Sequence, residues 1–246
     1  MKILGIIPAR GGSKRLPGKN IKKLAGKPLI AWTIESAKQS HLDRIIVTTD
    51  DLQIAKVAKR YGVEVPFIRP TELAGDKLGI EPVLTHALDW LKKEEGYQPD
   101  AVALLMPTFP LRQSNHIDEA IKIFKKKKVD SVVSVIEARA NANPHWILKK
   151  DKRGNCSLFN GQPLTEIITR SQDLPPCFSR NDMIYLLKPK NLRSKKPNLY
   201  GQKIQLYVMD DFYNSDINTP EDFFICLQKK RWLKSSEGKN FLKTKN

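Results

Sequence analysis

Short apolar runs and helical periodicities alternate along the first half of the chain. Continuous apolar runs bounded by polar or turn residues predict buried strands, and apolar residues spaced three and four apart predict helices. The predicted strands are residues 3–8, 44–48, 63–68, 101–106 and 131–136. The predicted helices are residues 29–39, 50–60, 83–91 and 117–124. Strands that alternate with helices favour right-handed crossovers, so we expect an α/β fold with a mostly parallel sheet and helices on both faces.

The alternation stops after the fifth predicted strand. Residues 139–180 hold several prolines and glycines and only short strand-like pieces, at 145–148 and 156–159. We interpret this segment as an arm inserted into one core, which would comprise residues 1–138 and 181–233. The remaining predicted elements are strands at 183–187 and 204–209, a helix at 220–233, and a frayed basic tail at 234–246.

The composition is that of a globular protein with a strong positive charge. Of 246 residues, 40% are hydrophobic and 28% charged, which suits one large domain, or one domain with a smaller insertion. The formal net charge of +17 favours anionic partners: phosphorylated or carboxylated ligands, nucleic acid or membrane surfaces. Because most surface lysines are simply solvated, the charge helps an anionic ligand arrive but does not identify it.

The cysteines and the apolar runs predict a protein of a reducing compartment. Cys156, Cys177 and Cys226 form no CxxC pair, and their odd number argues against a disulfide framework. The apolar start at residues 1–8 is too short for a signal sequence, and Arg10 follows it closely. No apolar run approaches the ~20 residues that span a bilayer. We therefore expect a cytoplasmic protein without a membrane span.

The loop after the first predicted strand carries the strongest chemical signal. From Pro8 to Asn20 it reads PARGGSKRLPGKN. In open α/β sheets, ligands bind at the carboxyl ends of strands, where this loop begins. Paired glycines let backbone N–H groups approach a phosphate, and cationic side chains add charge. The cations of this loop are Arg10, Lys14, Arg15 and Lys19. The combination predicts a triphosphate site.

Two familiar phosphate-binding loops do not describe this segment. Five residues separate Gly12 from Gly18 where a P-loop has four, and Asn20 follows Lys19 where a P-loop has Ser or Thr. The GxGxxG pattern of dinucleotide-binding folds is also absent. A basic surface loop with turn glycines is the alternative interpretation, but it does not explain why glycines and cations gather at one strand end.

Two further polar residues fit helix N-caps. Asp50 ends the second predicted strand, where it could contact a ligand. We favour an N-cap for Asp50, because Gln53 occupies the capping-box position three residues later. Asn115, just before the helix that includes Ile117, is interpreted in the same way.

Candidate metal ligands are few. Asp216 and Asn218 stand two residues apart, just before a clear helix start at Thr219 and Pro220. In an extended segment both side chains face one side and offer oxygens of the kind that Mg²⁺ prefers, although a turn would use the same residues. The histidines have no metal-ligand spacing, and neither HExxH nor GxSxG occurs. Nothing in the sequence therefore indicates a zinc hydrolase or a serine nucleophile.

Together, these segments resemble the acylneuraminate cytidylyltransferases, which make CMP-sialic acid and the CMP derivatives of related nonulosonic acids. The most distinctive motifs are PARGGSK in the first loop, PTFPLR near the middle and DINTPEDF near the end. The matching segments follow one order along residues 3–224: 6–20, 26–30, 45–50, 69–74, 104–112, 172–175, 181–185 and 216–223. Many collinear segments are far more specific than any single one.

The resemblance implies a Rossmann-like nucleotidyltransferase fold and a homodimer. The arm, residues 139–180, would help to build the sugar site of the partner subunit. The implied substrates are CTP and an acidic sugar such as a sialic acid, with Mg²⁺ as cofactor and no nucleic-acid partner. The anomeric hydroxyl of the sugar would attack the α-phosphorus, and pyrophosphate would leave. Such a transfer depends on positioning and charge stabilisation more than on covalent help from the protein.

The resemblance also implies roles for individual residues. The residues implied at the nucleotide are Arg10, Gly11, Gly12, Ser13, Lys19, Asn20 and Arg69. Those implied at the acidic sugar are Arg170, Gln172, Asn181 and Tyr185. Asp216 would bind Mg²⁺, with Asn218 as a second candidate ligand, and the catalytic set would be Arg10, Lys19 and Asp216.

Four positions depart from the pattern of the family. Asn218 stands where a second aspartate is usual, Met106 where a glutamine is usual, and Asp182 where a glycine is usual. Residues 77–80 lack the small hydroxyl side chains that are common near the nucleotide. These departures leave open a nucleotidyltransferase of the same fold that uses another base or a sugar phosphate. A non-catalytic binding protein on this scaffold is a further alternative, but it gives no reason for the intact basic loop.

Overall fold

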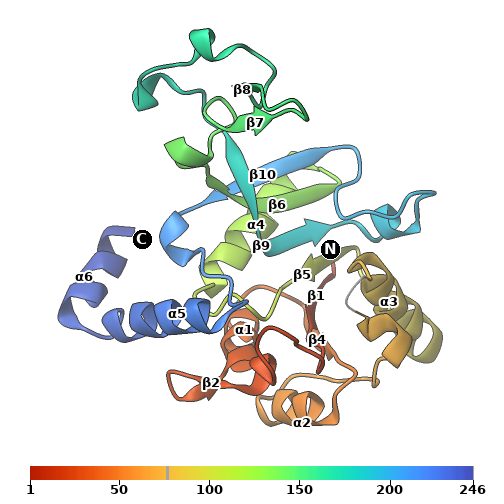
Figure 1. Cartoon of the computed structure of the whole chain (residues 1–246). Coiled ribbons are helices and arrows are strands. Elements are labelled where there is room, and N and C mark those ends of the chain that lie inside the picture. Colours follow the sequence, from red (N-terminus) through yellow and green to blue (C-terminus); the bar gives the residue numbers. More distant parts are fainter. Residues whose placement is uncertain (76–77, 246) are drawn as a thin grey trace.

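A six-stranded mixed sheet forms the centre of the protein (Figure 1). The computed structural model describes residues 1–75 and 78–245, with strand order β10-β6-β9-β5-β1-β4. The strands are β1 (Ile3–Pro8), β4 (Arg44–Thr48), β5 (Ala101–Leu104), β6 (Ser131–Glu137), β9 (Phe178–Leu187) and β10 (Ile204–Met209). β1 pairs in parallel with β4 and β5, and β10 with β6, whereas β9 is antiparallel to both neighbours. The predicted mostly parallel α/β sheet is confirmed.

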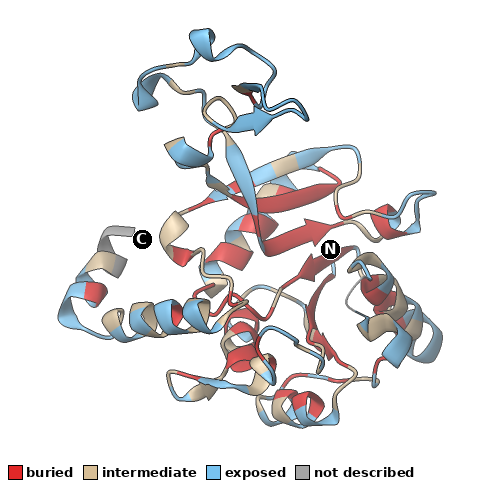
Figure 2. Ribbon diagram, in the orientation of Figure 1, coloured by how far each residue is buried: buried red, intermediate tan, exposed pale blue. Residues whose placement is uncertain are grey.

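Helices cover both faces of the sheet and bury its apolar side chains (Figure 2). The helices are α1 (Leu29–Lys38), α2 (Leu52–Arg60), α3 (Glu81–Glu95), α4 (Ser114–Lys127), α5 (Pro220–Trp232) and α6 (Ser236–Lys245). Because side chains alternate along a strand, β1 serves two cores. Ile3 and Ile7 belong to the core that includes α1 and α4 residues, and Leu4 and Ile6 to the core that includes α3 residues. This two-sided burial explains why the strands read as continuous apolar runs.

One predicted strand is absent and two predicted N-caps are wrong. Residues 63–68 form only two isolated bridges, from Glu64 to Ile46 in β4 and from Ile68 to Thr49 just after β4. A continuous ladder does not form because Pro66 lacks the backbone N–H that it needs. Helix α2 is capped by Asp51, whose carboxylate accepts from the N–H groups of Gln53 and Ile54, and Asp50 is left for another role. Helix α4 begins one residue before Asn115, with Gln113 as its N-cap.

The segment predicted as an arm stands away from the sheet (Figure 1). It contains a small antiparallel hairpin of β7 (Leu148–Lys150) and β8 (Cys156–Leu158) and several single 3₁₀ turns. Asn143 closes its base: Nδ2 donates to the carbonyl of Pro175 at 2.9 Å, and Oδ1 accepts from the N–H of His145 at 3.1 Å. The chain returns to the sheet at the start of β9, slightly before the predicted boundary.

The C-terminal segment is more ordered than predicted. Thr219 caps α5 in a capping box with Asp222, as the sequence indicates, and α5 ends at Trp232. The predicted frayed tail instead contains α6, whose Phe241 ring lies 4.7 Å from that of Phe212 and 5.2 Å from that of Trp232. The aromatic contact supplies the buried apolar surface that a polar segment needs to hold a helix. Among the described residues, no helix is both long and apolar enough to cross a membrane.

Candidate functional site

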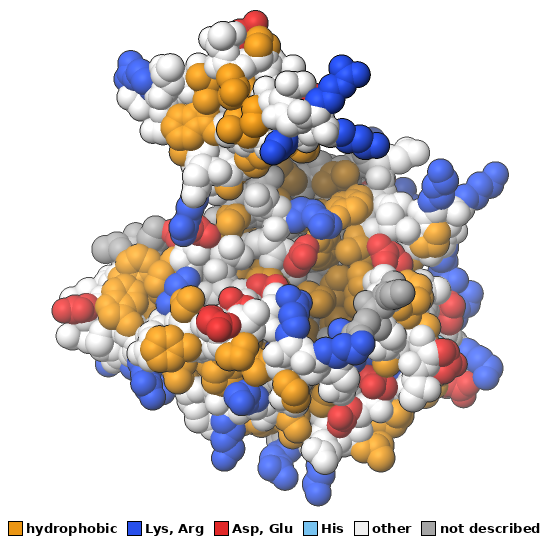
Figure 3. Space-filling view, viewed as in Figure 1, with side chains coloured by type: hydrophobic (Ala, Val, Ile, Leu, Met, Phe, Trp, Pro, Cys, Tyr) orange, Lys and Arg blue, Asp and Glu red, His pale blue; other side chains and the backbone are white. Residues whose placement is uncertain are grey.

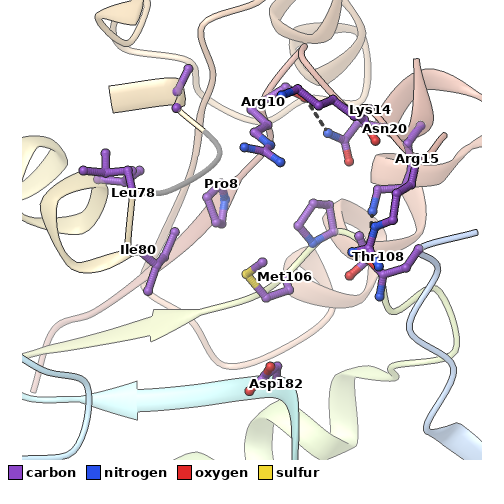
Figure 4. Close-up of a pocket in the computed structure, with 18 of the residues that line it drawn as sticks. Pro8, Arg10, Lys14, Arg15, Asn20, Leu78, Ile80, Met106, Thr108 and Asp182 are labelled. Carbon is purple, nitrogen blue, oxygen red and sulfur yellow. Dashed lines mark hydrogen bonds between the residues drawn. The ribbon is translucent and has the colours of Figure 1, made fainter. Parts of the chain in front are cut away.

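A cavity of about 540 Å³ opens at the carboxyl ends of β1 and β5 (Figure 4). The basic loop, the segment after Arg69, the turn after β5, and residues from β9 and the α5 approach together line it. The lining residues are Pro8, Arg10, Ser13, Lys14, Arg15, Lys19, Asn20, Arg69, Leu73, Ala74, Gly75, Leu78, Gly79, Ile80, Val83, Met106, Pro107, Thr108, Phe109, Asp182, Asp216 and Asn218. The loop that the sequence singled out therefore meets segments from across the chain.

Contacts between its own residues hold the basic loop in shape. Asn20 is buried and its Nδ2 donates to the carbonyl of Arg10 at 3.0 Å, which ties the two ends of the loop together. Gly18 has φ 64° at the start of the 3₁₀ turn Lys19–Ile21, a conformation that glycine adopts without strain. The Asn20 Oδ1 atom is buried without a hydrogen-bond partner among the described residues. An acceptor of this kind at the cavity wall suits a ligand that brings a donor.

Asp50 joins the basic loop to Arg69. Its Oδ1 accepts from Arg69 Nη2 at 3.0 Å and from the N–H of Gly11 at 3.3 Å. Arg69 is only 3% exposed, and burial lowers the pKa of its guanidinium although Asp50 opposes this. Its Nε has no hydrogen-bond partner within the described part of the chain. Asp50 therefore holds a buried cation beside the cavity with one donor still unpaired.

Lys19 links the basic loop to the segment before α5. Its Nζ donates to the carbonyl of Ile217 at 2.8 Å and lies 3.4 Å from Oδ1 of Asn218. Burial lowers the pKa of the Lys19 ammonium, and Arg15 and Arg10 add to the shift, while Asp216 opposes it. Lys19 therefore lies among charges of both signs, with Arg15 and Arg10 on one side of the balance and Asp216 and Asp222 on the other.

The two candidate metal ligands differ in their surroundings. Asn218 presents its Oδ1 to Arg15 Nη2 at 3.0 Å, and its Nδ2 donates to Oδ2 of Asp216. The other oxygen of Asp216, Oδ1, is buried without a hydrogen-bond partner among the residues described. That orphaned carboxylate oxygen fits a cation, whereas the Asn218 oxygen already faces two cationic side chains. No group of three or more His, Cys, Asp or Glu side chains able to hold a metal occurs in residues 1–75 and 78–245.

The residues implied at the nucleotide mostly gather at this cavity. Arg10, Ser13, Lys19, Asn20 and Arg69 line it. Gly11 and Gly12 are not among the lining residues, and the Gly11 N–H points to Asp50. Of the altered stretch 77–80, Lys77 lies outside the described residues, and the other three residues line the cavity.

The residues implied at the sugar do not gather at this cavity. Arg170 and Gln172 are exposed on the arm and do not line it. Asn181 and Tyr185 are buried in β9, where Asn181 accepts from Ser134 Oγ at 2.6 Å. Asp182, which stands between them in sequence where the family usually has a glycine, is exposed and lines the cavity.

Comparison with known proteins identifies the family. The chain belongs to the cytidylyltransferase family, whose family model, described as Cytidylyltransferase, matches residues 4–243. The chain is similar to a CMP-N,N'-diacetyllegionaminic acid synthase from Legionella pneumophila, at 39% identity over 91% of this chain and 94% of that protein. It is also similar to an N-acylneuraminate cytidylyltransferase from Escherichia coli O18:K1:H7, at 35% identity over 94% of this chain. The chain spans about half, 53%, of that longer relative.

A solved structure supports the fold. A CMP:2-keto-3-deoxy-manno-octonic acid synthetase complexed with CTP superimposes with a TM-score of 0.66 at 19% identity, over 96% of this chain and 100% of that chain. At this identity the likeness concerns the fold alone. It agrees with the predicted nucleotidyltransferase architecture.

Proposed function

From its family and its cavity, we propose that the protein transfers CMP from CTP to an acidic nonulosonic sugar, with release of pyrophosphate. The observation that carries the proposal is the arrangement of charge around the cavity. Among the described residues, five cationic side chains, Arg10, Lys14, Arg15, Lys19 and Arg69, line it together with Asp216, whose Oδ1 has no hydrogen-bond partner there. The names of the two sequence relatives point to the same reaction, with legionaminic or neuraminic acid derivatives as acceptors. The sugar is therefore proposed as a class.

The reaction forms one P–O bond and breaks another. The anomeric hydroxyl oxygen of the sugar bonds to the α-phosphorus of CTP and loses its proton, which leaves to water. The bond from the α-phosphorus to the bridging oxygen breaks, and pyrophosphate departs with the electron pair. Arg10 and Lys19 would stabilise the charge that moves onto the leaving group, and Arg69 with Asn20 would hold the nucleoside side. Fixed cations in a partly buried cavity are suited to this task because they need little reorganisation.

The proposal includes Mg²⁺ at Asp216. The unpaired, buried Oδ1 atom of Asp216 is the observation that favours it, because Mg²⁺ takes hard oxygen ligands and relies on substrate phosphates for others. When bound, the ion would neutralise phosphate charge and lower the pKa of a hydroxyl near it. Asn218 would orient Asp216 through its Nδ2 donor while its oxygen holds Arg15.

The proposal also includes a homodimer in which the arm acts on the partner. Apolar side chains gather on the arm and are 37–61% exposed (Figure 3). They are Ile147, Leu148, Phe159, Leu164 and Ile167. An exposed cluster of apolar side chains is typical of an interaction surface. Arg170 and Gln172, on the same arm, would then face the acidic sugar in the partner subunit.

The test of the reaction has two steps. Thermal shifts with CTP, UTP, GTP, ATP and dTTP, each with Mg²⁺, should show selective stabilisation by CTP. A ligand at 100 times its Kd adds roughly 2.7 kcal/mol to the stability of the native state, which is easily measured. Pyrophosphate release from CTP is then assayed with N-acetylneuraminic, N,N'-diacetyllegionaminic and pseudaminic acids. Selective stabilisation by another nucleotide, or release only with a sugar 1-phosphate, would contradict the proposal.

Subunit mixing tests the arm. Lys19→Ala disables the nucleotide site, and Arg170→Ala disables the arm, so each homodimer should be nearly inactive. After subunit exchange, one site of each heterodimer combines an intact Lys19 with an intact Arg170 from the other subunit. Random exchange should restore about a quarter of the wild-type activity. Mixing without any recovery, although exchange is demonstrated, would show that the arm serves its own subunit.

A further inference from the structure

Asp182 presents a carboxylate to the cavity from an unusual backbone conformation. It lies on β9, on the side of Met106 away from Arg10 and Asn20 (Figure 4). Its φ is 55°, in the left-handed region that non-glycine residues rarely adopt. Residues held in such conformations are concentrated at functional sites, where the surrounding structure maintains them.

A bulge in β9 turns Asp182 outward. The pairing of β9 with β6 shifts register between Val133 and Val135. Opposite the shift, Ser134 Oγ donates to Asn181 Oδ1 at 2.6 Å and accepts from the N–H of Ile184 at 2.8 Å. Since a bulge redirects the side chains of the longer strand, Asn181 points into the core and Asp182 into the cavity.

Neighbouring side chains orient the carboxylate. The hydroxyl of Tyr185 donates to Asp182 Oδ1, and Arg180 Nη1 lies 3.4 Å from the same hydroxyl and donates to that of Tyr200. Burial raises the pKa of Tyr185, which keeps its hydroxyl protonated as a donor. The second oxygen of Asp182, Oδ2, accepts no hydrogen bond from the described residues. One oxygen is thus anchored, and the other is available to a ligand.

Asp182 places a negative charge in a cavity whose other charged side chains are mostly cationic. Of the described residues in the lining, Asp182 and Asp216 carry carboxylates, and Asp216 is the one beside Lys19. Asp182 lies on the side of Met106 away from Arg10 and Asn20, and Met106 and Phe109 contribute apolar side chains to the lining. A carboxylate there repels a carboxylate of the sugar and attracts a hydrogen-bond donor.

We propose that Asp182 is a specificity-determining residue, whose Oδ2 accepts a hydrogen bond from a neutral donor of the acceptor sugar, a hydroxyl or an acylamino N–H. This inference rests on the proposed function. The same carboxylate disfavours acceptors that place a second anionic group at this wall, and it directs the sugar's own carboxylate toward the cations. Tyr185 acts as a positioning residue, because it holds Asp182 without lining the cavity.

The test compares two variants with the wild-type protein. Asp182→Asn keeps the shape, and Asn is among the residues that tolerate positive φ. If the side-chain oxygen of the introduced asparagine keeps the hydrogen bond from Tyr185, the amide NH₂ group takes the place of Oδ2. This NH₂ group is a donor, so it cannot accept a hydrogen bond from the donor of the sugar. Asp182→Gly removes the carboxylate, and glycine readily adopts the positive φ of this position. This variant is therefore expected to fold even if Asp182→Asn does not. For the best of the three acidic sugars, kcat/KM should fall at least tenfold in both variants, with the KM for CTP within twofold of wild type.

The outcomes separate the two proposals. If the wild-type protein releases pyrophosphate with an acidic sugar but both variants match its kcat/KM, Asp182 does not select the sugar. An equal rise in the KM values for CTP and sugar would show a structural role and would likewise overturn the inference. If the wild-type protein uses none of the three sugars, the proposed function fails and the role of Asp182 falls with it.

Discussion

Replacing Asp50 by alanine should weaken CTP binding far more than replacing its neighbour Asp51. Asp50 connects two parts of the nucleotide site: the N–H of Gly11 in the basic loop, and the guanidinium of Arg69. Asp51 instead caps α2. The two carboxylates are adjacent in sequence, so the pair of variants controls for a general loss of charge at this strand end.

The magnitude follows from the burial of the two partners. Arg69 is 3% exposed and the Asp50 side chain 16% exposed. Removing one partner of a fully buried ion pair costs about 3–5 kcal/mol, and access of water through the cavity places this pair at or below the lower end of that range. We expect Asp50→Ala to lose about 2–3 kcal/mol of stability. Asp51→Ala should lose about 1 kcal/mol, the usual effect of deleting a helix cap.

The assay measures urea unfolding and the KM for CTP in parallel. Because Arg69 would lose its fixed position, the KM for CTP should rise about 10- to 100-fold in Asp50→Ala, equivalent to about 1.4–2.8 kcal/mol of binding free energy. In Asp51→Ala the KM for CTP should stay within about twofold of wild type, since Asp51 does not line the cavity and does not hold Arg69.

Simple electrostatics predicts the opposite sign. Deleting a carboxylate near a triphosphate raises the local positive potential, which would lower the KM for CTP. A lower or unchanged KM in Asp50→Ala would therefore refute the argument that Asp50 acts by positioning Arg69. Equal effects of the two variants would also refute it.

Three further predictions concern polar and charged side chains elsewhere in the site and the fold. Lys19→Ala should lower kcat about 10²- to 10³-fold with the fold retained, and a folded variant with normal turnover would remove the triphosphate role of Lys19. Asn218→Asp should lower the Mg²⁺ concentration for half-maximal activity about tenfold, since it places a second carboxylate beside Asp216; an unchanged Mg²⁺ titration would place residue 218 outside the metal site. Asp130→Asn should lose about 1–3 kcal/mol, because Lys190 and Lys188 and two backbone N–H groups hold that carboxylate and lower its pKa. A carboxylate whose folded-state pKa is depressed stabilises the fold fully above its unfolded-state pKa, so the difference between wild type and Asp130→Asn should be constant from about pH 7 to 5 and shrink below about pH 4 in thermal unfolding.

The sequence was most informative where burial is two-sided. Strands β1, β4 and β10 begin and end at the predicted residues, because a run of apolar side chains leaves little choice of boundary. The predicted strand at 63–68 failed because a single proline interrupts its ladder, a local rule that outweighs apolar content. The C-terminal helix α6 was missed because the aromatic contact of Phe241 with Phe212 and Trp232 is tertiary.

Within the site, the sequence indicated the right segments but not always the right member of each segment. Asp50 and Asp51 are adjacent aspartates, and the start of α2 decides which one caps the helix and which one reaches Arg69. Asn181 and Asp182 pose the same problem, because a bulge decides which side chain enters the core. Neighbouring residues on extended backbone face opposite sides, so a shift of one residue exchanges a structural role for a functional one. Which of two neighbouring residues faces the cavity depends on the partner strand or on where a helix begins, and the sequence does not show either directly. The charge pattern therefore identifies the phosphate-binding edge of the sheet more securely than the residue that selects the sugar.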